Sequence, residues 1–325
     1  MGHKTHNDGQ IGATFTSEGR VMITGFKRIL IPTDLSDFSG LALKYGALFN
    51  RLAGSNLTLL FVEEGYVAFD LSAMPVGYYI NSLPGSPDPL MAKLAEQARL
   101  YAPGISVQNR IVTEAPSRGI VKTASDIDAD LIIMGTHGRH GVERAFLGSV
   151  TERVLHSTDR AVFTVSPLHF DLEGEIAIRR ILCPVNFTRI GRAALAYAAG
   201  VAETFHAELV VTYVVENGAE PSTARAGKEL ATWIAPEVGD RVKYREIISH
   251  GDAAGRVLET AAEVDADLLV IGSQHKFFSD ATVIGTTTER VTRFARIPVI
   301  TVPLNLPVRD KILSRVDRQP AAVPA

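Results

Sequence analysis

DADLIIMGTHGR (residues 128–139) and DADLLVIGSQHK (residues 265–276) decide the fold of this 325-residue chain, because they are two copies of one pattern. Other stretches repeat in the same order: FKRILIPTD (26–34) matches IRRILCPVN (178–186), and SVTERV (149–154) matches TTTERV (286–291). A duplicated unit indicates the architecture more firmly than local propensities do. The chain therefore consists of two homologous halves.

Each copy contains a continuous apolar run, LIIM (131–134) or LLVI (268–271), of the kind that is typical of a parallel sheet covered on both faces. Such runs alternate with amphipathic helical stretches. We expect strands near 27–33, 56–62, 105–112, 130–135 and 161–165, and again near 179–185, 207–214, 242–248, 267–272 and 297–302. Helices are expected near 38–53, 88–101, 116–127 and 148–157, and near 189–204, 223–235, 252–264 and 285–295. This alternation predicts a doubly wound α/β fold in each half.

The repeats also predict the boundaries of the domains. We expect a flexible leader over 1–25, a first domain over 26–167, a second domain over 176–304 and a loose tail over 305–325. The first half alone carries a Pro- and Gly-rich insertion after its second strand, at residues 65–89. Its aromatic residues favour packing, either as a lid over a ligand or against the other half.

Composition and charge exclude several classes of protein. The chain has 46% hydrophobic and 21% charged residues, near the globular average, and its net charge of -3 provides no footprint for nucleic acid. No apolar run is long enough to cross a membrane, and residues 1–25 lack the apolar core of a signal peptide. Cys183 is the only cysteine, which excludes an internal disulfide and fits a reducing compartment. We expect a cytoplasmic protein without nucleic-acid or membrane partners.

Two loops follow strands at the edge where doubly wound sheets bind ligands. The first is Pro32-Thr33-Asp34; the second runs from Gly135 through Thr136, His137, Gly138 and Arg139 to Gly148, Ser149, Val150 and Thr151. Glycines let the backbone approach a ligand closely, and a helix that begins near Ser149 presents free N–H groups and its positive dipole end to an anion. The hydroxyls of Ser149 and Thr151 add donors. The pattern favours a phosphate site, with an ordinary turn and helix cap as the alternative.

Both common nucleotide-binding signatures are absent: no G-x-x-x-x-G-K-[ST] occurs, and no G-x-G-x-x-G follows the first strand of either half. What remains is G-x2-G-x9-G-[ST], met by Gly135, Gly138, Gly148 and Ser149. Three further motifs accompany it: I-P-T-D after the first strand, A-D-L-I-I-M-G-T-H-G-R and S-V-T-E-R-V. The whole set is echoed in the second half, and it resembles the universal stress protein family in its tandem two-domain form. The resemblance covers roughly residues 26–304.

The resemblance implies an α/β fold that is Rossmann-like, or adenine nucleotide alpha hydrolase-like. Each domain would hold a five-stranded parallel sheet in the order 3-2-1-4-5, with helices on both faces. The two halves would form an intramolecular pseudo-dimer through their fifth strands, at VFTV (162–165) and VITV (299–302). A homodimer of such paired chains is a further alternative.

The resemblance also implies that ATP binds in the first domain. Carried over to this sequence, Asp34 would hold the ribose or adenine beside Pro32 and Thr33, and Val62 would contact the adenine. Met134 and Gly135 would line the ribose side, Gly138 would admit the phosphates, and Gly148, Ser149, Val150 and Thr151 would donate to them. Asp34 has a structural explanation as well, because any one of Asp34, Ser36 and Asp37 could form an Asx turn or cap the helix that follows.

The second half departs from this pattern at two positions. His275 replaces the glycine that corresponds to Gly138, and Asn186 replaces the aspartate that corresponds to Asp34. A side chain at 275 restricts the backbone and fills space that phosphates need, and Asn186 keeps an acceptor but loses the charge. Gly285 and Thr286 persist at a helix start. The second half is interpreted as a degenerate structural partner, with a site remodelled for another ligand as the alternative.

The leading hypothesis for function is an ATP-binding, nucleotide-responsive regulator in a stress response, because the loop has no evident catalytic base or Walker lysine. The alternatives are a slow ATP hydrolase or autophosphorylating protein, in which Ser149, Thr151 or His137 assists a water, and a scaffold without nucleotide. His137 and His140 fall short of a metal site, whereas Mg²⁺ that accompanies the phosphates needs few protein ligands. Arg139 and Arg144 either neutralise phosphate or are ordinary solvated charges.

Overall fold

The computed structural model describes residues 12–15, 21–24, 26–64, 88–136, 147–166, 176–216, 223–273, 275–278, 281–304 and 306. The first half contains β3 (Arg28–Thr33), α1 (Asp37–Ala53), β4 (Asn56–Glu63), α3 (Pro89–Tyr101), β5 (Val107–Thr113), α4 (Pro116–Asp126), β6 (Leu131–Gly135), α5 (Ser149–Ser157) and β7 (Ala161–Val165). The second half contains β8 (Arg180–Val185), α6 (Arg189–Phe205), β9 (Glu208–Val215), α7 (Thr223–Val238), β10 (Tyr244–His250), α8 (Ala253–Glu263), β11 (Leu268–Ser273), α9 (Thr286–Phe294) and β14 (Val299–Pro303). The predicted strands and helices are therefore present in the predicted order.

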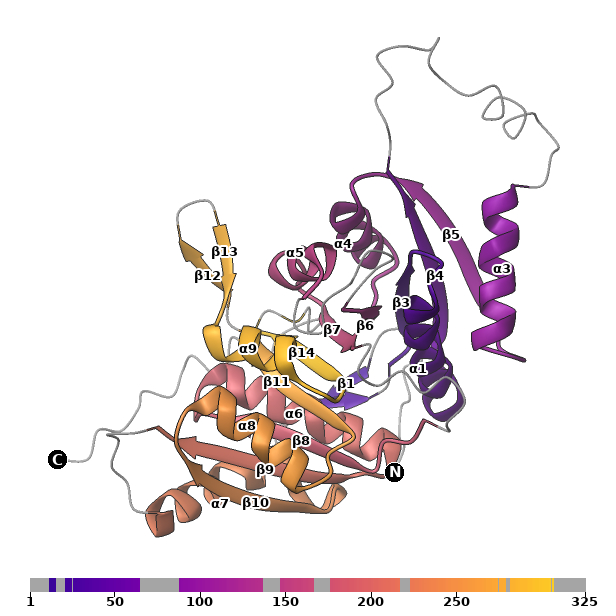
Figure 1. Ribbon diagram of the computed structural model, residues 1–325. Coiled ribbons are helices and arrows are strands. Elements are labelled where there is room, and N and C mark those ends of the chain that lie inside the picture. The colour runs from indigo at the N-terminus through magenta and orange to yellow at the C-terminus, as the bar shows by residue number, and fades with distance from the viewer. Residues whose placement is uncertain are drawn as a thin grey trace.

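The strands of both halves form one continuous sheet (Figure 1). Within the described residues its order is β10-β9-β8-β11-β14-β7-β6-β3-β4-β5, so each half has the order 3-2-1-4-5 that the family resemblance implies. The strands within a half are parallel, and the halves meet where β14 pairs antiparallel with β7, Ile300 opposite Phe163. The predicted pairing through the fifth strands is confirmed, and the two expected sheets are two parts of a single ten-stranded one.

Two short antiparallel ribbons lie outside the elements that the sequence predicts. β1 (Gly12–Phe15) pairs with β2 (Val21–Thr24) inside the stretch expected to be a leader without regular structure, and β2 lies against α6. β12 (His275–Phe278) pairs with β13 (Ala281–Ile284) where the second half departs from the glycine pattern. β13 contacts α5, so this part of the second half lies against the first half.

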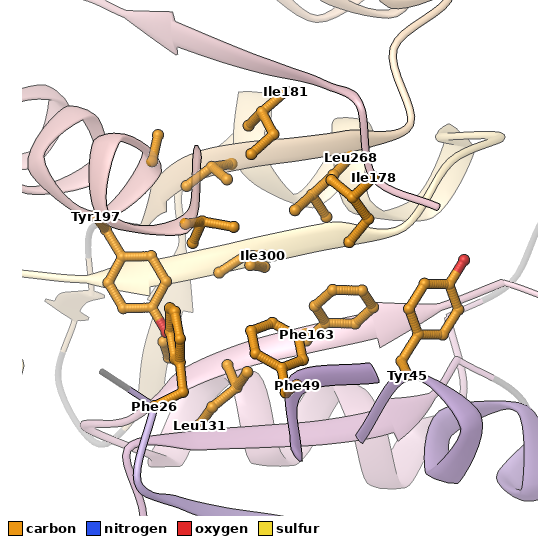
Figure 2. Packing of buried hydrophobic residues seen from close by; sticks show 14 of the residues in the cluster. Phe26, Tyr45, Phe49, Leu131, Phe163, Ile178, Ile181, Tyr197, Leu268 and Ile300 are labelled. Atoms are coloured by element: carbon orange, nitrogen blue, oxygen red, sulfur yellow. The ribbon is translucent and has the colours of Figure 1, made fainter. Parts of the chain in front are cut away.

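The largest apolar core is shared between the halves. α1 and α6 contact each other on one face of the sheet, and buried side chains of both halves meet there across the β7–β14 seam, as Figure 2 shows. The ring of Phe26 packs edge-on against Phe49 of the first half at 4.9 Å and against Tyr197 of the second half at 5.6 Å. On the opposite face, each half has a separate smaller cluster under its own helices. Among the described residues, a shared core therefore joins the halves on one face of the sheet only.

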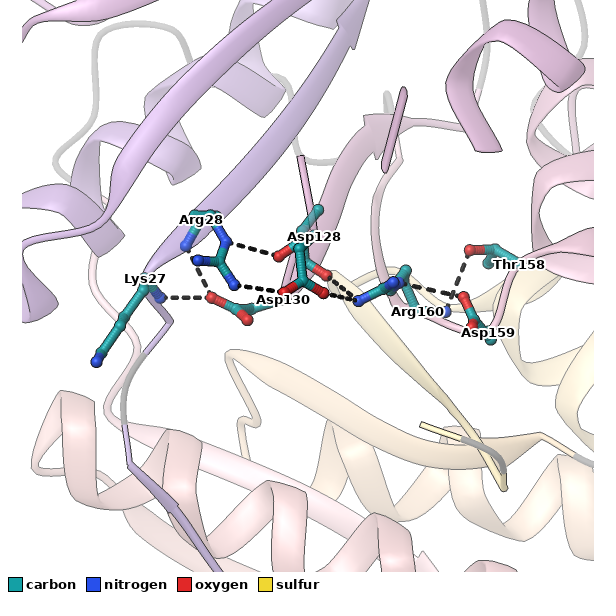
Figure 3. A network of polar contacts seen from close by, with 8 residues as sticks. Lys27, Arg28, Asp128, Asp130, Thr158, Asp159 and Arg160 are labelled. Carbon is teal, nitrogen blue, oxygen red and sulfur yellow. Dashed lines mark hydrogen bonds and ion pairs between the residues drawn. The ribbon is translucent and has the colours of Figure 1, made fainter. Parts of the chain in front are cut away.

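The repeated DAD sequence explains how the first and fourth strands of each half are held together. The Asp130 carboxylate accepts hydrogen bonds from the backbone N–H groups of Lys27 and Arg28, each at 2.8 Å, and Asp267 does the same for Arg179 and Arg180. Figure 3 shows the bonds of Asp130 to Lys27 and Arg28 at the amino end of β3. Burial raises the pKa of Asp130, and the two N–H groups act in the opposite direction. This part of the repeated motif is therefore structural.

Asp128 extends the network to the start of β7. Its two carboxylate oxygens bind different guanidinium groups, Oδ2 that of Arg28 and Oδ1 that of Arg160, each at 3.0 Å (Figure 3). Arg160 is almost completely buried, and its Nη1 also donates to the carbonyl of Ala129 at 3.1 Å. These bonds join the ends of β3, β6 and β7 at the edge away from the carboxyl ends of the strands.

The hydroxyl groups of two tyrosines are predicted to contribute differently to stability. The Tyr101 hydroxyl donates to Asp37 at 2.8 Å, whereas the Tyr197 hydroxyl is buried without a hydrogen-bond partner among the described residues. We expect Tyr101→Phe to lower the free energy of unfolding by about 1 kcal/mol, and Tyr197→Phe to leave it unchanged or raise it. Urea denaturation of both variants measures this difference. An equal loss in the two variants would contradict the assignment of their hydroxyls.

Candidate nucleotide site

The candidate site lies at the carboxyl ends of β3, β4 and β6, and the strand order reverses between β3 and β6. The structure places the described residues of the predicted site at this edge: Pro32, Thr33 and Asp34 at the end of β3, Val62 in β4, Met134, Gly135 and Thr136 at the end of β6, and Gly148, Ser149, Val150 and Thr151 at the start of α5. His137, Gly138 and Arg139 lie outside the described residues. This edge is where doubly wound sheets bind ligands.

The loop after β3 is a tight Asx turn. Asp34 Oδ1 accepts the backbone N–H of Ser36 at 3.0 Å and also the Ser36 hydroxyl, while Ser36 in turn caps α1 by accepting the N–H of Ser39 at 3.3 Å. Leu35, between them, has the left-handed backbone conformation with φ 65°. Asp34 therefore forms the Asx turn that the sequence offered as its structural explanation.

The second half builds the same turn without a charge. Asn186 Oδ1 accepts the Thr188 hydroxyl at 2.6 Å, Thr188 caps α6, and Phe187 between them has φ 56°. An uncharged side chain thus accompanies the same left-handed residue, hydroxyl bond and helix cap. The negative charge of Asp34 is not needed for this local structure, and a carboxylate is a suitable acceptor for ribose hydroxyls.

A buried polar network holds the turn of the first half in place. The Thr33 hydroxyl lies 2.7 Å from Gln97 Oε1 and 2.8 Å from the Ser39 hydroxyl, and the Gln97 side-chain amide donates to the Ser36 carbonyl at 3.1 Å. All three side chains that form this cluster, Thr33, Ser39 and Gln97, are buried. The Thr33 hydroxyl is therefore already engaged with the protein.

The second half replaces this polar network with apolar contacts. Val185 stands where Thr33 does, and Gly191 where Ser39 does. The indole of Trp233 fills the space beside Gly191 and packs edge-on against Phe187, with ring centroids 5.7 Å apart. The guanidinium of Arg192 lies 5.0 Å from the centre of the Trp233 ring. The two halves reach the same loop conformation through different chemistry.

Two threonines hold the second loop to the sheet. The Thr151 hydroxyl donates to the Gly135 carbonyl at 2.9 Å, and Thr288 makes the same bond to Gly272 at 2.8 Å in the second half. Thr136 bonds to the Val165 carbonyl through its backbone N–H, and its own carbonyl accepts the N–H of Gly148 at 2.7 Å. The Thr151 hydroxyl proton is used by the bond to Gly135, so in this geometry the backbone N–H is the donor of Thr151 that remains free.

The start of α5 has the features of an anion site. Gly148 is the N-cap residue, with no side chain to cap the helix, and Ser149 is exposed. The backbone N–H groups of the first turn, Ser149 to Thr151, have no acceptor within the helix. These donors and the helix dipole together favour a bound phosphate.

Val62 and Met134 border this edge from the sheet. Met134 is buried, whereas Val62 is partly exposed and packs closely against Gly119 in α4. A Cβ atom at Gly119 would lie 2.9 Å from Val62 Cγ1, so a side chain there would displace Val62. Sequence reasoning missed Gly119; a comparison of the halves offered a signal, since Arg256 stands at the corresponding position.

The described residue ranges contain no group of three or more His, Cys, Asp or Glu side chains placed to hold a metal ion. None of their helices has the length and apolar character needed to span a bilayer.

The fold and the edge just described define a class: doubly wound α/β proteins with a glycine-bordered helix N-terminus at the switch point. The universal stress protein family model matches residues 25–166 and 177–303, and the chain belongs to this family. It is 33% identical to the universal stress protein MJ0577 of Methanocaldococcus jannaschii over 43% of this chain and 94% of that one. A universal stress protein structure from Archaeoglobus fulgidus matches 85% of this chain and 98% of its own, with TM-score 0.64 and 23% identity.

Single-domain members of the family have been solved with adenine nucleotides. One universal stress protein structure is a complex with cAMP (21% identity, TM-score 0.32; 43% of this chain and 97% of that one). Another, from Archaeoglobus fulgidus, is a complex with dAMP (19% identity, TM-score 0.31; 39% of this chain and 99% of that one). These ligands are properties of those two proteins.

Proposed function

We propose that this universal stress protein binds ATP, accompanied by Mg²⁺, in its first half, and that occupancy of the site regulates its conformation or partners. The observation that carries the proposal is the uncapped start of α5, with free N–H groups at the edge that also holds Asp34. Phosphates would lie on the turn that begins at Gly148, and the Asp34 carboxylate would accept bonds from the ribose hydroxyls.

The differences between the halves support a single site. Asn186 stands in place of Asp34, and the second half keeps the left-handed residue and the hydroxyl bond of this turn without the charge. Where the second half departs from the glycine pattern, it forms the β12–β13 ribbon, and β13 contacts α5. We infer that the second half serves as a structural partner.

The content of the purified protein tests the proposal directly. We expect that denaturing the protein releases an adenine nucleotide, identified by mass spectrometry, with at most one bound per chain. Titration calorimetry of nucleotide-free protein with ATP and Mg²⁺ should then give one site. The proposal fails if no adenine nucleotide is released and none binds in the titration. Two sites of similar affinity would disprove the asymmetry.

A further inference from the structure

An ion pair in the second half joins α9 to the start of the neighbouring helix, α8. Arg290 of α9 binds Asp252 through two bonds, Nη1 to Oδ1 at 2.8 Å and Nη2 to Oδ2 at 3.0 Å. Asp252 is the N-cap residue of α8, and it also accepts the N–H of Gly255 at 2.8 Å. A guanidinium at this position of α9 thus reaches the carboxyl edge of the sheet and is neutralised there.

The first half retains the arginine and lacks its acidic partner. Arg153 of α5 corresponds to Arg290, and Ala115, the N-cap residue of α4, corresponds to Asp252. Arg153 is exposed and has no ion pair or hydrogen bond from its side chain within the described part of the chain. Glu114, the acid that precedes α4, pairs instead with Arg118 at 3.4 Å.

The geometry of a helix directs Arg153 toward the candidate site. Side chains on a helix lean toward its N-terminus, so a long side chain one turn into α5 covers the turn before it. That turn carries the free N–H groups of Ser149 to Thr151. Arg290 shows that the same position reaches the start of the neighbouring helix.

We propose that Arg153 is a ligand-binding residue whose guanidinium contacts the phosphate chain of the nucleotide, and that Ala115 keeps it available by not neutralising it. This inference rests on the proposed function. An arginine suits the role because its planar guanidinium donates two parallel hydrogen bonds to phosphate oxygens and remains charged at any physiological pH. In the second half Asp252 occupies the corresponding donors of Arg290, in line with the proposal that the nucleotide binds in the first half alone.

Two substitutions test the proposal from opposite directions. Arg153→Gln removes the charge, and Ala115→Asp supplies the partner that Arg290 has in the second half. Each is expected to weaken binding of ATP by about tenfold, the size of one charge-assisted hydrogen bond, and to change binding of adenosine by less than about twofold. Aspartate is a favourable N-cap residue, so Ala115→Asp retains the fold. Titration calorimetry with ATP and with adenosine, together with thermal melting, measures these effects.

Asp252→Ala is the matched control, because it frees Arg290 in the second half and should leave the affinity for ATP unchanged. The double variant Ala115→Asp/Arg153→Gln should bind ATP no better than Arg153→Gln alone. If the wild type binds ATP and both single variants bind it equally well, the role of Arg153 is disproved and the proposed function stands. Equal weakening for ATP and adenosine also disproves the phosphate contact. A wild type that binds no adenine nucleotide overturns both the role of Arg153 and the proposed function.

Discussion

Replacing Phe163 by alanine is expected to lower the free energy of unfolding by about 3–5 kcal/mol, the usual cost of removing a buried ring. Phe163 lies in β7, is fully buried, and pairs with Ile300 across the seam between the halves. Its ring packs against Tyr45 at 5.0 Å and Phe49 at 6.1 Å. The cavity would therefore open in the core that joins the halves. Urea denaturation followed by circular dichroism measures the loss.

Phe294→Ala provides the control for this variant. Phe294, in α9, is 50% exposed, so the same change of side chain should alter stability by no more than about 0.5 kcal/mol. A loss of less than 1 kcal/mol in Phe163→Ala would contradict the close packing of the seam. Because the core is shared, we also expect both halves of the wild type to unfold in one transition, and two separate transitions would show that the seam contributes little.

The second large effect is expected on ligand binding, where Ser149→Asp should weaken ATP affinity by about 100-fold. Ser149 is the first residue of α5, and a carboxylate there would lie beside the proposed phosphate position. Two like charges 4 Å apart repel by about 4 kcal/mol at the effective dielectric constant of a protein surface. Exposure and salt reduce this value, and a loss of about 100-fold, which corresponds to about 2.7 kcal/mol, is expected to remain.

Thr286→Asp separates this effect from any change in the helix. Thr286 is the first residue of α9 and is exposed like Ser149, so both substitutions place an acid at the same position of equivalent helices. An acid at a helix N-terminus stabilises the helix, so neither variant should melt below the wild type. Thr286→Asp is expected to bind ATP as the wild type does. Similar weakening in both variants would argue against a site confined to the first half.

The sequence predicted the fold well because its determinants are local and occur twice. Apolar runs such as LIIM form the buried strands, and each lies where its pattern predicts. The strand order and the seam between the fifth strands came from the family resemblance. The ribbons were missed, since β1 and β2 are four-residue strands in a polar segment and β12 and β13 fall on what was expected to be a loop.

The site could be predicted as a set of loops but not as a set of contacts. Thr33 bonds to Gln97 across 64 residues of sequence, and no local pattern indicates that a threonine after a strand will meet a glutamine on a distant helix. Leu35 and Phe187 adopt the left-handed conformation without being glycine, asparagine or aspartate, the residues that usually signal it. The ligand contacts of all the predicted site residues remain predictions, and His137, Gly138 and Arg139 also lie outside the described residues.

The antiparallel pairing of β7 with β14 has a consequence for how the two halves could diverge. Two separate copies of one chain that paired in this way would be identical, so any substitution would appear at both sites at once. Here the partner is part of the same polypeptide, and each half can change independently. Asn186, Arg256 and Asp252 are three such one-sided differences from Asp34, Gly119 and Ala115. Under the proposed function, covalent linkage would thus give each molecule a fixed ratio of one nucleotide-binding half to one supporting half, whatever the protein concentration.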